Sequence, residues 1–228
     1  MNISKLLSTR VSNIKINPFL EDLTAQKNFL HSQIKDKKIL VIGGAGTIGS
    51  SYIQQILKYK PSKITVVDIN ENGLTELTRD LRSSNLMDYS PEYITYPVNL
   101  LSTTFDKIFN SDTWDVVSNF SAHKHVRSEK DKISVEALIK NNVFGAIKLL
   151  NLCELHPPKY FFSVSTDKAA NPVNIMGASK SLMEKLILSK KGQFRVSTAR
   201  FANVAFSNGS LLDGFIYRLN KKQPLSCP

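Results

Sequence analysis

Short apolar runs alternate with longer segments of mixed polarity along most of the chain. Each run has the length of a β-strand and is rich in β-branched or aromatic residues. The runs are Ile39–Ile42, Ile64–Val67, Tyr93–Val98, Val116–Phe120, Tyr160–Val164 and Phe194–Ala199. Most of them lack the alternation of a half-exposed strand, so we expect burial on both faces, as in a parallel sheet between two helical layers.

The segments between the runs have the apolar spacing of helices. They predict helices over Ile48–Lys58, Asn72–Leu81, Ser134–Leu155, Met176–Ser189 and Leu211–Leu219. Ahead of them, the break at Asn17-Pro18 is followed by Phe19–Ile34, which predicts one amphipathic helix. Alternating strands and helices predict an α/β fold with a doubly wound parallel sheet.

Composition defines the class of protein. At 228 residues the chain can hold one domain and part of a second. Its composition, with 42% hydrophobic and 21% charged residues, is ordinary for a soluble globular protein. No apolar stretch approaches the ~18 residues that cross a bilayer, and the N-terminus lacks a signal-peptide core. Cys153 and Cys227 form no CxxC pair, which indicates a reducing cytoplasm rather than a disulfide framework or a metal knuckle.

The net charge of +11 comes mostly from scattered lysines. A basic surface attracts nucleic acids, anionic membranes and phosphorylated metabolites alike. No basic run is interleaved with aromatic residues, so nucleic-acid binding is a minor hypothesis. Solvated lysine is the simpler interpretation, and a phosphorylated metabolite is a compatible partner.

A glycine-rich loop joins the first predicted strand to the helix after it. Gly43, Gly46 and Gly49 have GxxGxxG spacing, and Thr47 and Ile48 complete the predicted site. Glycine leaves the backbone N–H groups at the helix N-terminus accessible to a pyrophosphate, and the last glycine lets helix and strand pack closely. Because the loop lies between a strand and a helix, we predict a dinucleotide site here rather than a plain turn.

Asp68 ends the second predicted strand, 19 residues after Gly49. An acidic side chain at this place accepts hydrogen bonds from the adenosine ribose and repels a 2′-phosphate, which favours NAD over NADP. Arg79 and Arg82 lie on the following helix, within reach of a 2′-phosphate, so both cofactors stay open. Helix capping is the structural alternative for Asp68.

Polar residues also follow the fifth predicted strand, in the stretch Ser163–Lys168. Ligands of α/β folds bind at this carboxyl edge of the sheet. Helical spacing of four then places Met176 and Lys180 on one face of the next helix. The loop Asn171–Asn174 turns the chain back toward the site.

Three strings follow the glycine loop in order: AHKHV (Ala122–Val126), STDKAANPVNIMGASK (Ser165–Lys180) and RFANV (Arg200–Val204). With the loop they resemble the extended short-chain dehydrogenase/reductase superfamily, and within it the UDP-N-acetylglucosamine 4,6-dehydratases of the bacterial polysaccharide-biosynthesis branch. The resemblance covers about residues 37–228. It implies an NAD(P)-binding Rossmann domain over residues 37–205, with a helical extension over 1–36 and the start of a substrate-binding region over 206–228. Because the family continues beyond the position of Pro228, we expect a truncated chain with its substrate domain largely missing.

In that family NAD(P) takes a hydride from sugar C4, water is lost across C5–C6, and the hydride returns to C6. The resemblance implies that Asp167 is the acid and Lys168 the C5 base, the latter partly deprotonated by burial beside other cations. Ser165 or Thr166 would hydrogen-bond the C4 hydroxyl. Lys180 would hold the nicotinamide ribose and lower the pKa of nearby groups.

Met176 departs from the wider superfamily, where most members place tyrosine. A thioether has no proton to exchange, so Met176 is not the base. Either the site is degraded or another group such as Asp167 takes over. Methionine also occurs here in one branch of these dehydratases, which favours an active design in which Met176 shapes the pocket beside the sugar or nicotinamide.

The resemblance assigns further residues at the carboxyl ends of the other strands. Cofactor contacts are implied for Asn99, Ala122 and Lys124, and substrate contacts for His125 and Asn203. Asn142 matches a helix asparagine that supports the active-site strand. No carboxylate or cysteine joins His123 and His125, so no metal site is predicted.

Three functions remain open from the sequence. The leading one is a nucleotide-sugar 4,6-dehydratase, a lyase acting on a UDP-sugar in surface polysaccharide or glycan biosynthesis. A sugar-nucleotide 4-epimerase shares the fold and the first oxidation but needs no acid–base pair for the loss of water. A non-catalytic dinucleotide-binding module is the third. The resemblance also implies a homo-oligomer that pairs through the helices Ser134–Leu155 and Met176–Ser189.

Overall fold

The computed structural model describes residues 18–124 and 129–225 of the chain. Its centre is a 6-stranded sheet whose strands follow the order β3-β2-β1-β4-β5-β6, with every neighbouring pair parallel. The strands are β1 (Lys38–Ile42), β2 (Lys63–Asp68), β3 (Glu92–Pro97), β4 (Val116–Asn119), β5 (Tyr160–Thr166) and β6 (Arg195–Phe201). All the predicted strands are therefore confirmed, and the doubly wound parallel fold with them.

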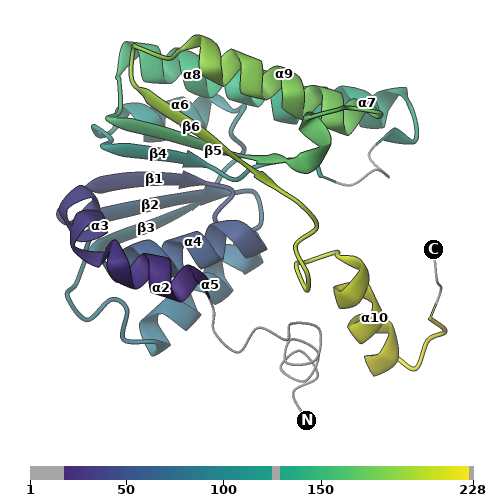
Figure 1. Ribbon diagram of the computed structural model, residues 1–228, viewed down its shortest axis with the longest axis horizontal. Coiled ribbons are helices and arrows are strands. Elements are labelled where there is room, and N and C mark those ends of the chain that lie inside the picture. The colour runs from purple at the N-terminus through teal and green to yellow at the C-terminus, as the bar shows by residue number, and fades with distance from the viewer. Residues whose placement is uncertain (1–17, 125–128, 226–228) are drawn as a thin grey trace. The chain divides into compact units, whose positions relative to one another are not determined.

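Helices cover both faces of the sheet (Figure 1). On one face lie α4 (Thr47–Leu57) and α5 (Glu71–Ser83); on the other lie α6 (Thr103–Asn110), α8 (Gly145–Leu155) and α9 (Ile175–Ser189). The sequence interpretation contained no helix at α6, which has only 8 residues. Ser102 caps it by accepting a hydrogen bond from the Phe105 N–H, and Phe105, Ile108 and Phe109 form its buried side.

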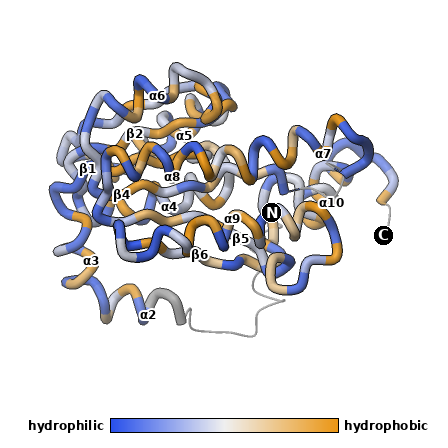
Figure 2. The backbone as a smooth tube through the Cα atoms, turned by 90° about the horizontal axis from the view of Figure 1, so that it is seen from above, coloured by the Kyte–Doolittle hydropathy of each residue, from blue (hydrophilic) through white to orange (hydrophobic). Residues whose placement is uncertain are grey.

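The apolar strand residues lie between these two layers. In β1 all residues from Ile39 to Ile42 are at most 2% exposed, as continuous apolar strands in a parallel sheet should be. On the helices hydrophobic and hydrophilic residues alternate, as the tube of α8 shows in Figure 2. The core on the α6–α8–α9 side includes Phe105, Leu149 and Phe161.

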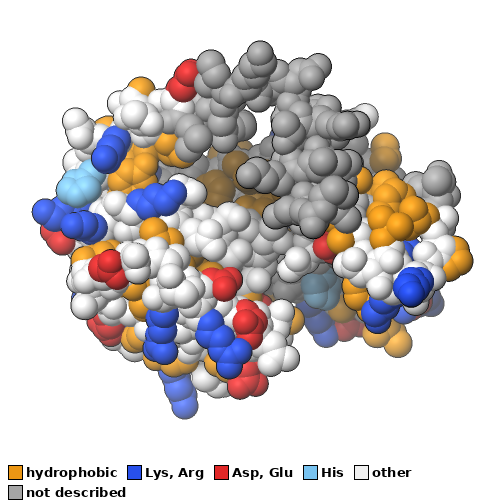
Figure 3. Space-filling model, turned by 90° about the horizontal axis from the view of Figure 1, so that it is seen from below, with side chains coloured by type: hydrophobic (Ala, Val, Ile, Leu, Met, Phe, Trp, Pro, Cys, Tyr) orange, Lys and Arg blue, Asp and Glu red, His pale blue; other side chains and the backbone are white. Residues whose placement is uncertain are grey.

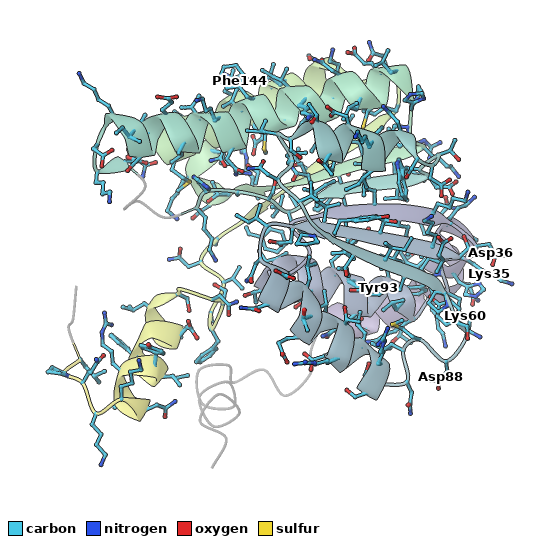
Figure 4. The ribbon with its side chains drawn as sticks, turned by 180° about the vertical axis from the view of Figure 1, so that it is seen from behind. Lys35, Asp36, Lys60, Asp88, Tyr93 and Phe144 are labelled. Atoms are coloured by element: carbon cyan, nitrogen blue, oxygen red, sulfur yellow. The ribbon has the colours of Figure 1, made fainter. Side chains whose placement is uncertain are left out.

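The helix predicted over Ser134–Leu155 is not one regular α-helix. It consists of α7 (Lys132–Ile139), a π-helical turn η2 (Lys140–Phe144) and α8. The extra residue of a π turn changes which side chains face inward, and such turns are frequent at functional sites. Here Asn142 is 2% exposed, whereas Phe144 is 54% exposed and points outward from the helical layer (Figure 4).

The amino edge of the sheet carries a network of ion pairs. Lys63 Nζ lies 2.8 Å from Glu92 and 3.0 Å from Asp112, and Lys38 Nζ lies 2.7 Å from the same Asp112. Lys35, Asp36 and Lys60 gather near this edge (Figure 4). The network joins the starts of β1, β2 and β3 to the loop before β4, at the end of the sheet opposite to the glycine loop.

The chain forms two compact units. The larger, Lys35–Asn203, contains the whole sheet, and the smaller comprises residues Met1–Ile34 and Val204–Pro228. In the smaller unit the single helix predicted over Phe19–Ile34 is two helices, α2 (Pro18–Ala25) and α3 (Lys27–Ile34), which meet at Gln26. The predicted last helix is confirmed as α10 (Leu211–Asn220). None of the helices in the described ranges is long and apolar enough to cross a membrane.

Candidate functional site

The glycine loop leads from β1 into α4 and has no room for side chains. A Cβ on Gly43, whose φ is +76°, would lie 2.5 Å from the Ser121 nitrogen, and a Cβ on Gly49 would lie 2.4 Å from the Gly43 oxygen. Gly49 therefore lets α4 pack directly onto the loop, as predicted. Gly44, which the spacing argument did not single out, is equally confined, since its Cβ would lie 2.3 Å from a methyl carbon of Val66.

Gly46 is the exposed glycine of the loop. A Cβ there would meet a single neighbouring atom within 4 Å, the Gly43 oxygen at 3.5 Å. As the N-cap of α4 it offers no side-chain acceptor to the first helical turn, which begins with Thr47 and Ile48. A helix N-terminus without a side-chain cap, behind an open glycine, is suited to hold a pyrophosphate.

Asp68 is hydrogen-bonded to the backbone of the same glycine loop. Its Oδ2 accepts a hydrogen bond of 2.9 Å from the Ala45 N–H, and its Oδ1 accepts one of 2.9 Å from the Asn70 N–H. The cap of α5 is Asn70, which accepts from the Gly73 N–H. Asp68 is therefore not the cap residue of α5, and its half-buried carboxylate lies at the carboxyl end of β2 beside the loop.

The other cofactor candidates lie at the same edge of the sheet. Asn99 follows β3, is exposed and accepts a hydrogen bond of 2.8 Å from the Leu101 N–H. Ala122 is half-buried and Lys124 exposed, both in the segment after β4. Arg79, a candidate for a 2′-phosphate, pairs instead with Glu76 at 2.6 Å on the surface of α5. The substrate candidate His125 lies outside the described residues.

Asn142 joins this edge to the helical layer. Its Oδ1 accepts from the His123 N–H at 2.9 Å, and its Nδ2 donates to the His123 carbonyl at 3.1 Å and to Ser179 Oγ at 3.1 Å. One buried amide thus holds both the segment after β4 and the start of α9. These contacts reach the segment after β4 and α9, whereas the resemblance implied support of the active-site strand.

The end of β5 places the predicted acid–base residues together. Thr166 Oγ1 donates a hydrogen bond of 2.9 Å to Asp167 Oδ1. Lys168 Nζ lies 3.3 Å from the same oxygen and 3.5 Å from Asn203 Oδ1. These four side chains form the candidate catalytic cluster. Ser165 is only 5% exposed, so Thr166 is the better placed of the two hydroxyls.

The charges in this cluster differ from the expectation for a base lysine. Lys168 is 38% exposed in its side chain and its nearest charged partner is the Asp167 carboxylate, not a set of buried cations. The hydrogen bond from Thr166, followed by that from Lys168, holds the pKa of Asp167 below its ordinary value. Asp167 is thus an ionised carboxylate at neutral pH.

Met176 and Lys180 share the buried face of α9, as predicted from their spacing. They are 4% and 3% exposed. Lys180 Nζ donates to the Val164 carbonyl at 2.8 Å and lies 3.3 Å from Met183 Sδ. Burial lowers the pKa of Lys180 to about 8, while the charge of Glu184 acts in the opposite direction.

Two carboxylates near this helix were not anticipated from the sequence. Glu129 Oε1 accepts a hydrogen bond of 2.7 Å from the Met176 N–H at the start of α9. Glu184 lies one turn after Lys180 and is bound by Arg200 of β6. The i,i+4 spacing of Lys180 and Glu184 was a usable signal, whereas nothing in the sequence connects Glu129 with Met176. Among the described residues no cluster of His, Cys, Asp and Glu could hold a metal.

The chain matches a known family over most of its length. Residues 39–227 match the family described as "Polysaccharide biosynthesis protein". Relatives include an uncharacterized membrane protein of Methanocaldococcus jannaschii (35% identity, 84% of this chain and 56% of that protein) and a UDP-N-acetylglucosamine 4,6-dehydratase (inverting) of Campylobacter jejuni (32%, 78% and 52%). A UDP-glucose 4-epimerase of Rickettsia prowazekii is also similar (28%, 84% and 56%). The chain spans about half the length of these curated relatives.

Solved structures share the fold. Pen from Bacillus thuringiensis superposes with a TM-score of 0.73 at 28% identity, over 85% of this chain and 60% of that one. The Bordetella bronchiseptica enzyme WbmF, in complex with NAD+, gives a TM-score of 0.67 at 17% identity, over 86% of this chain and 63% of that one. The likeness to WbmF concerns the fold alone.

Proposed function

This chain belongs to the polysaccharide biosynthesis protein family, and we propose that it carries the cofactor site and the acid–base residues of a nucleotide-sugar 4,6-dehydratase. The substrate in this proposal is a UDP-linked N-acetylhexosamine and the product its 4-keto-6-deoxy form. The observation that carries the proposal is the Thr166–Asp167–Lys168 cluster at the end of β5. An epimerase oxidises C4 but has no need of an acid and a base for the loss of water.

The cofactor of the proposal is a nicotinamide dinucleotide, with NAD favoured over NADP. Gly46 and the first turn of α4 would hold the pyrophosphate, and Asp68 would accept the ribose hydroxyls. The preference for NAD comes from Asp68 alone, because Arg79 and Arg82 are both exposed on α5 and the pairing of Arg79 with Glu76 is a surface contact. When bound, the nicotinamide supplies hydride acceptance from C4 and hydride return to C6.

The proton of the C4 hydroxyl needs an acceptor, since Met176 is not one. The Thr166 hydroxyl donates a hydrogen bond to the ionised Asp167 carboxylate. It can therefore accept the proton of the sugar C4 hydroxyl while it passes its own proton to Asp167. Asp167 is then protonated. In the next step it can give this proton to the C6 hydroxyl, which leaves as water.

Lys168 takes the remaining proton, from C5. Its Nζ lies 3.3 Å from the Asp167 carboxylate, so the proposed acid and the proposed base stand side by side, as the loss of water across C5–C6 requires. In the proposal Lys168 accepts the proton of C5 once oxidation of C4 has made the C5–H acidic, and it returns the proton to C5 as C6 is reduced.

The remaining assignments concern binding. Lys180 would donate to the nicotinamide ribose, Met176 would shape the pocket, and Asn203 would lie near the substrate pyrophosphate, with Lys168 at its amide oxygen. Residues 206–228 would begin the substrate-binding region. We also propose a homo-oligomer, because the helices α7 to α9 expose the apolar residues Ile133, Phe144 and Leu182.

A nucleic-acid partner is not part of the proposal. The face shown in Figure 3 carries Lys and Arg side chains interspersed with Asp and Glu rather than a continuous basic tract. Proteins that bind nucleic acids contact the phosphates through clusters of Lys and Arg side chains.

The test is incubation of the purified chain with UDP-N-acetylglucosamine and NAD or NADP, followed by proton NMR. A new methyl doublet with loss of the C6 hydroxymethylene signals supports dehydration, and Asp167→Asn should abolish it. Appearance of the C4 epimer without a methyl signal supports the epimerase instead. Binding of the dinucleotide with neither product supports the non-catalytic module.

A further inference from the structure

Two charged side chains are buried one helical turn apart on the inner face of α9. Lys180 is 3% exposed and Glu184 is 5% exposed. Positions i and i+4 are neighbours on a helix surface. Charged residues are almost never fully buried unless they are paired, so both side chains need partners.

Glu184 has its partner on the sheet. Arg200 Nε lies 2.9 Å from Oε1 and Arg200 Nη2 lies 2.7 Å from Oε2, which is the two-pronged geometry that guanidinium and carboxylate form best. Arg200 is directly opposite Ser165 in the register of β6 and β5. The ion pair therefore fixes α9 to β6, the strand that pairs with β5 beside the candidate catalytic cluster.

Among the described residues, Lys180 has only neutral acceptors within hydrogen-bond distance. These are the Val164 carbonyl at 2.8 Å and the Met183 sulfur at 3.3 Å. A buried ammonium without a counter-ion tends to lose its proton. The carboxylate of Glu184, on the next turn of the helix, opposes this loss.

We propose that Glu184, held in place by Arg200, is a positioning residue that keeps Lys180 in its ammonium form, so that the three side chains act as one charged unit. Removal of the carboxylate would leave two cations near each other with no anion between them. Removal of the guanidinium would leave the Glu184 charge to act on Lys180 alone. The role of Lys180 toward the nicotinamide ribose rests on the function proposed above, whereas the coupling of the three side chains does not.

The other ionisable groups on the described elements packed against α9 are neutral, exposed or in contact with a partner elsewhere. Cys153 of α8 is neutral, because burial raises the pKa of its thiol to about 12. Glu129 accepts from the Met176 N–H, and Lys132 and Lys185 are exposed. The remaining contacts are Asp167 with Lys168, Glu136 with Lys140, Asp106 with Lys148, Glu154 with Lys190, and Arg195 over the ring of Tyr160.

The experiment is an NMR titration of the unliganded full chain labelled with ¹³C and ¹⁵N in lysine. The Lys180 signal is identified by its loss in Lys180→Arg, and its midpoint in the wild type should be near pH 8. In Glu184→Gln, which keeps an amide oxygen for Arg200, the midpoint should fall by about one pH unit. In Arg200→Gln the Lys180 midpoint should rise, because the Glu184 carboxylate is then no longer partly neutralised by a guanidinium.

Glu154→Gln is the matched control. It also removes one carboxylate from an ion pair, that of Glu154 in α8 with Lys190 at the C-cap of α9, and should leave the Lys180 midpoint unchanged. Amide spectra verify that each variant is folded. The proposal is overturned if Glu184→Gln titrates as the wild type does, or if both variants shift the midpoint in the same direction, as loosened packing would. Since no turnover is measured, the outcome is independent of the dehydratase assignment.

Discussion

The Thr166 hydroxyl donates a hydrogen bond of 2.9 Å to the Asp167 carboxylate. This contact, between neighbours at the end of a buried strand, gives a half-buried hydroxyl a proton acceptor of its own. It also contributes most to the lowered pKa of Asp167. Methionine at position 176 is therefore compatible with an active site, because the proton path need not pass through that position.

Thr166→Val tests this path. Valine keeps the shape of threonine but has no hydroxyl, so we expect kcat for dehydration to fall about 10²- to 10⁴-fold, the usual contribution of a positioned acid–base group. Dinucleotide affinity should stay unchanged. Thr166→Ser is the control and should retain most of the rate, since it restores the hydroxyl. A Thr166→Val enzyme with the rate of the wild type would contradict the proposed relay.

Gly49→Ala tests the glycine loop. The added methyl would lie 2.4 Å from the Gly43 oxygen, so the loop or α4 must move. We expect the free energy of unfolding to fall by about 1–3 kcal/mol and dinucleotide binding, measured by calorimetry, to be lost or greatly weakened. Gly214→Ala in α10, where the nearest atom is 3.5 Å away, should leave dinucleotide binding unchanged and should not lower the free energy of unfolding. Normal binding by Gly49→Ala would place the dinucleotide elsewhere.

Asp68→Asn tests cofactor choice. An amide keeps one acceptor oxygen for the Ala45 N–H or Asn70 N–H but lacks the negative charge that repels a 2′-phosphate. The ratio of NADP to NAD dissociation constants should therefore fall, by about tenfold. Competition binding with both dinucleotides measures the ratio. An unchanged ratio would show that Asp68 serves the loop alone.

Asp112→Asn tests the ion-pair network at the amino edge. Burial opposes the charge of Asp112, but the hydrogen bonds from Lys38 and Lys63 outweigh it and hold the pKa at about 2, against 3.8 in the unfolded chain. Its carboxylate therefore stabilises the fold above pH 3.8, and this stabilisation is lost as the pH falls through about 2. Urea unfolding should show Asp112→Asn about 2 kcal/mol less stable at pH 7 and no less stable near pH 2.

The control for this prediction is Glu76→Gln, which removes an exposed ion pair with Arg79. Its effect should stay below about 1 kcal/mol at any pH. If Asp112→Asn and the wild type differed equally at pH 7 and pH 2, the difference would come from packing and not from the charge.

The strands were predictable because burial on both faces removes polar residues from them. The Ile39–Ile42 run has this property in the sequence and is almost fully buried in the structure. The glycine loop was predictable as well, since the confinement of Gly43 and Gly49 follows from a strand and a helix that meet at a tight turn. Local spacing also placed Met176 and Lys180 on one face.

Features that depend on contacts distant in sequence were not predictable. The π turn that buries Asn142 leaves no periodic signal in a pattern that reads as one helix. The pairing of Glu184 with Arg200 requires the register of β6 against β5 and the placement of α9. The exposure of Lys168 beside Asp167 likewise follows from the 3₁₀ turn after β5 (Asp167–Ala169), not from the residue types.

The central claim is that a hydride from C4 of the sugar ends on C6 of the same molecule. The most direct measurement uses UDP-N-acetylglucosamine deuterated at C4, with the product analysed by NMR and mass spectrometry. A 4,6-dehydratase places the deuterium in the C6 methyl group as CH₂D. Deuterium that is retained at C4, in either the substrate or its C4 epimer, would contradict the claim.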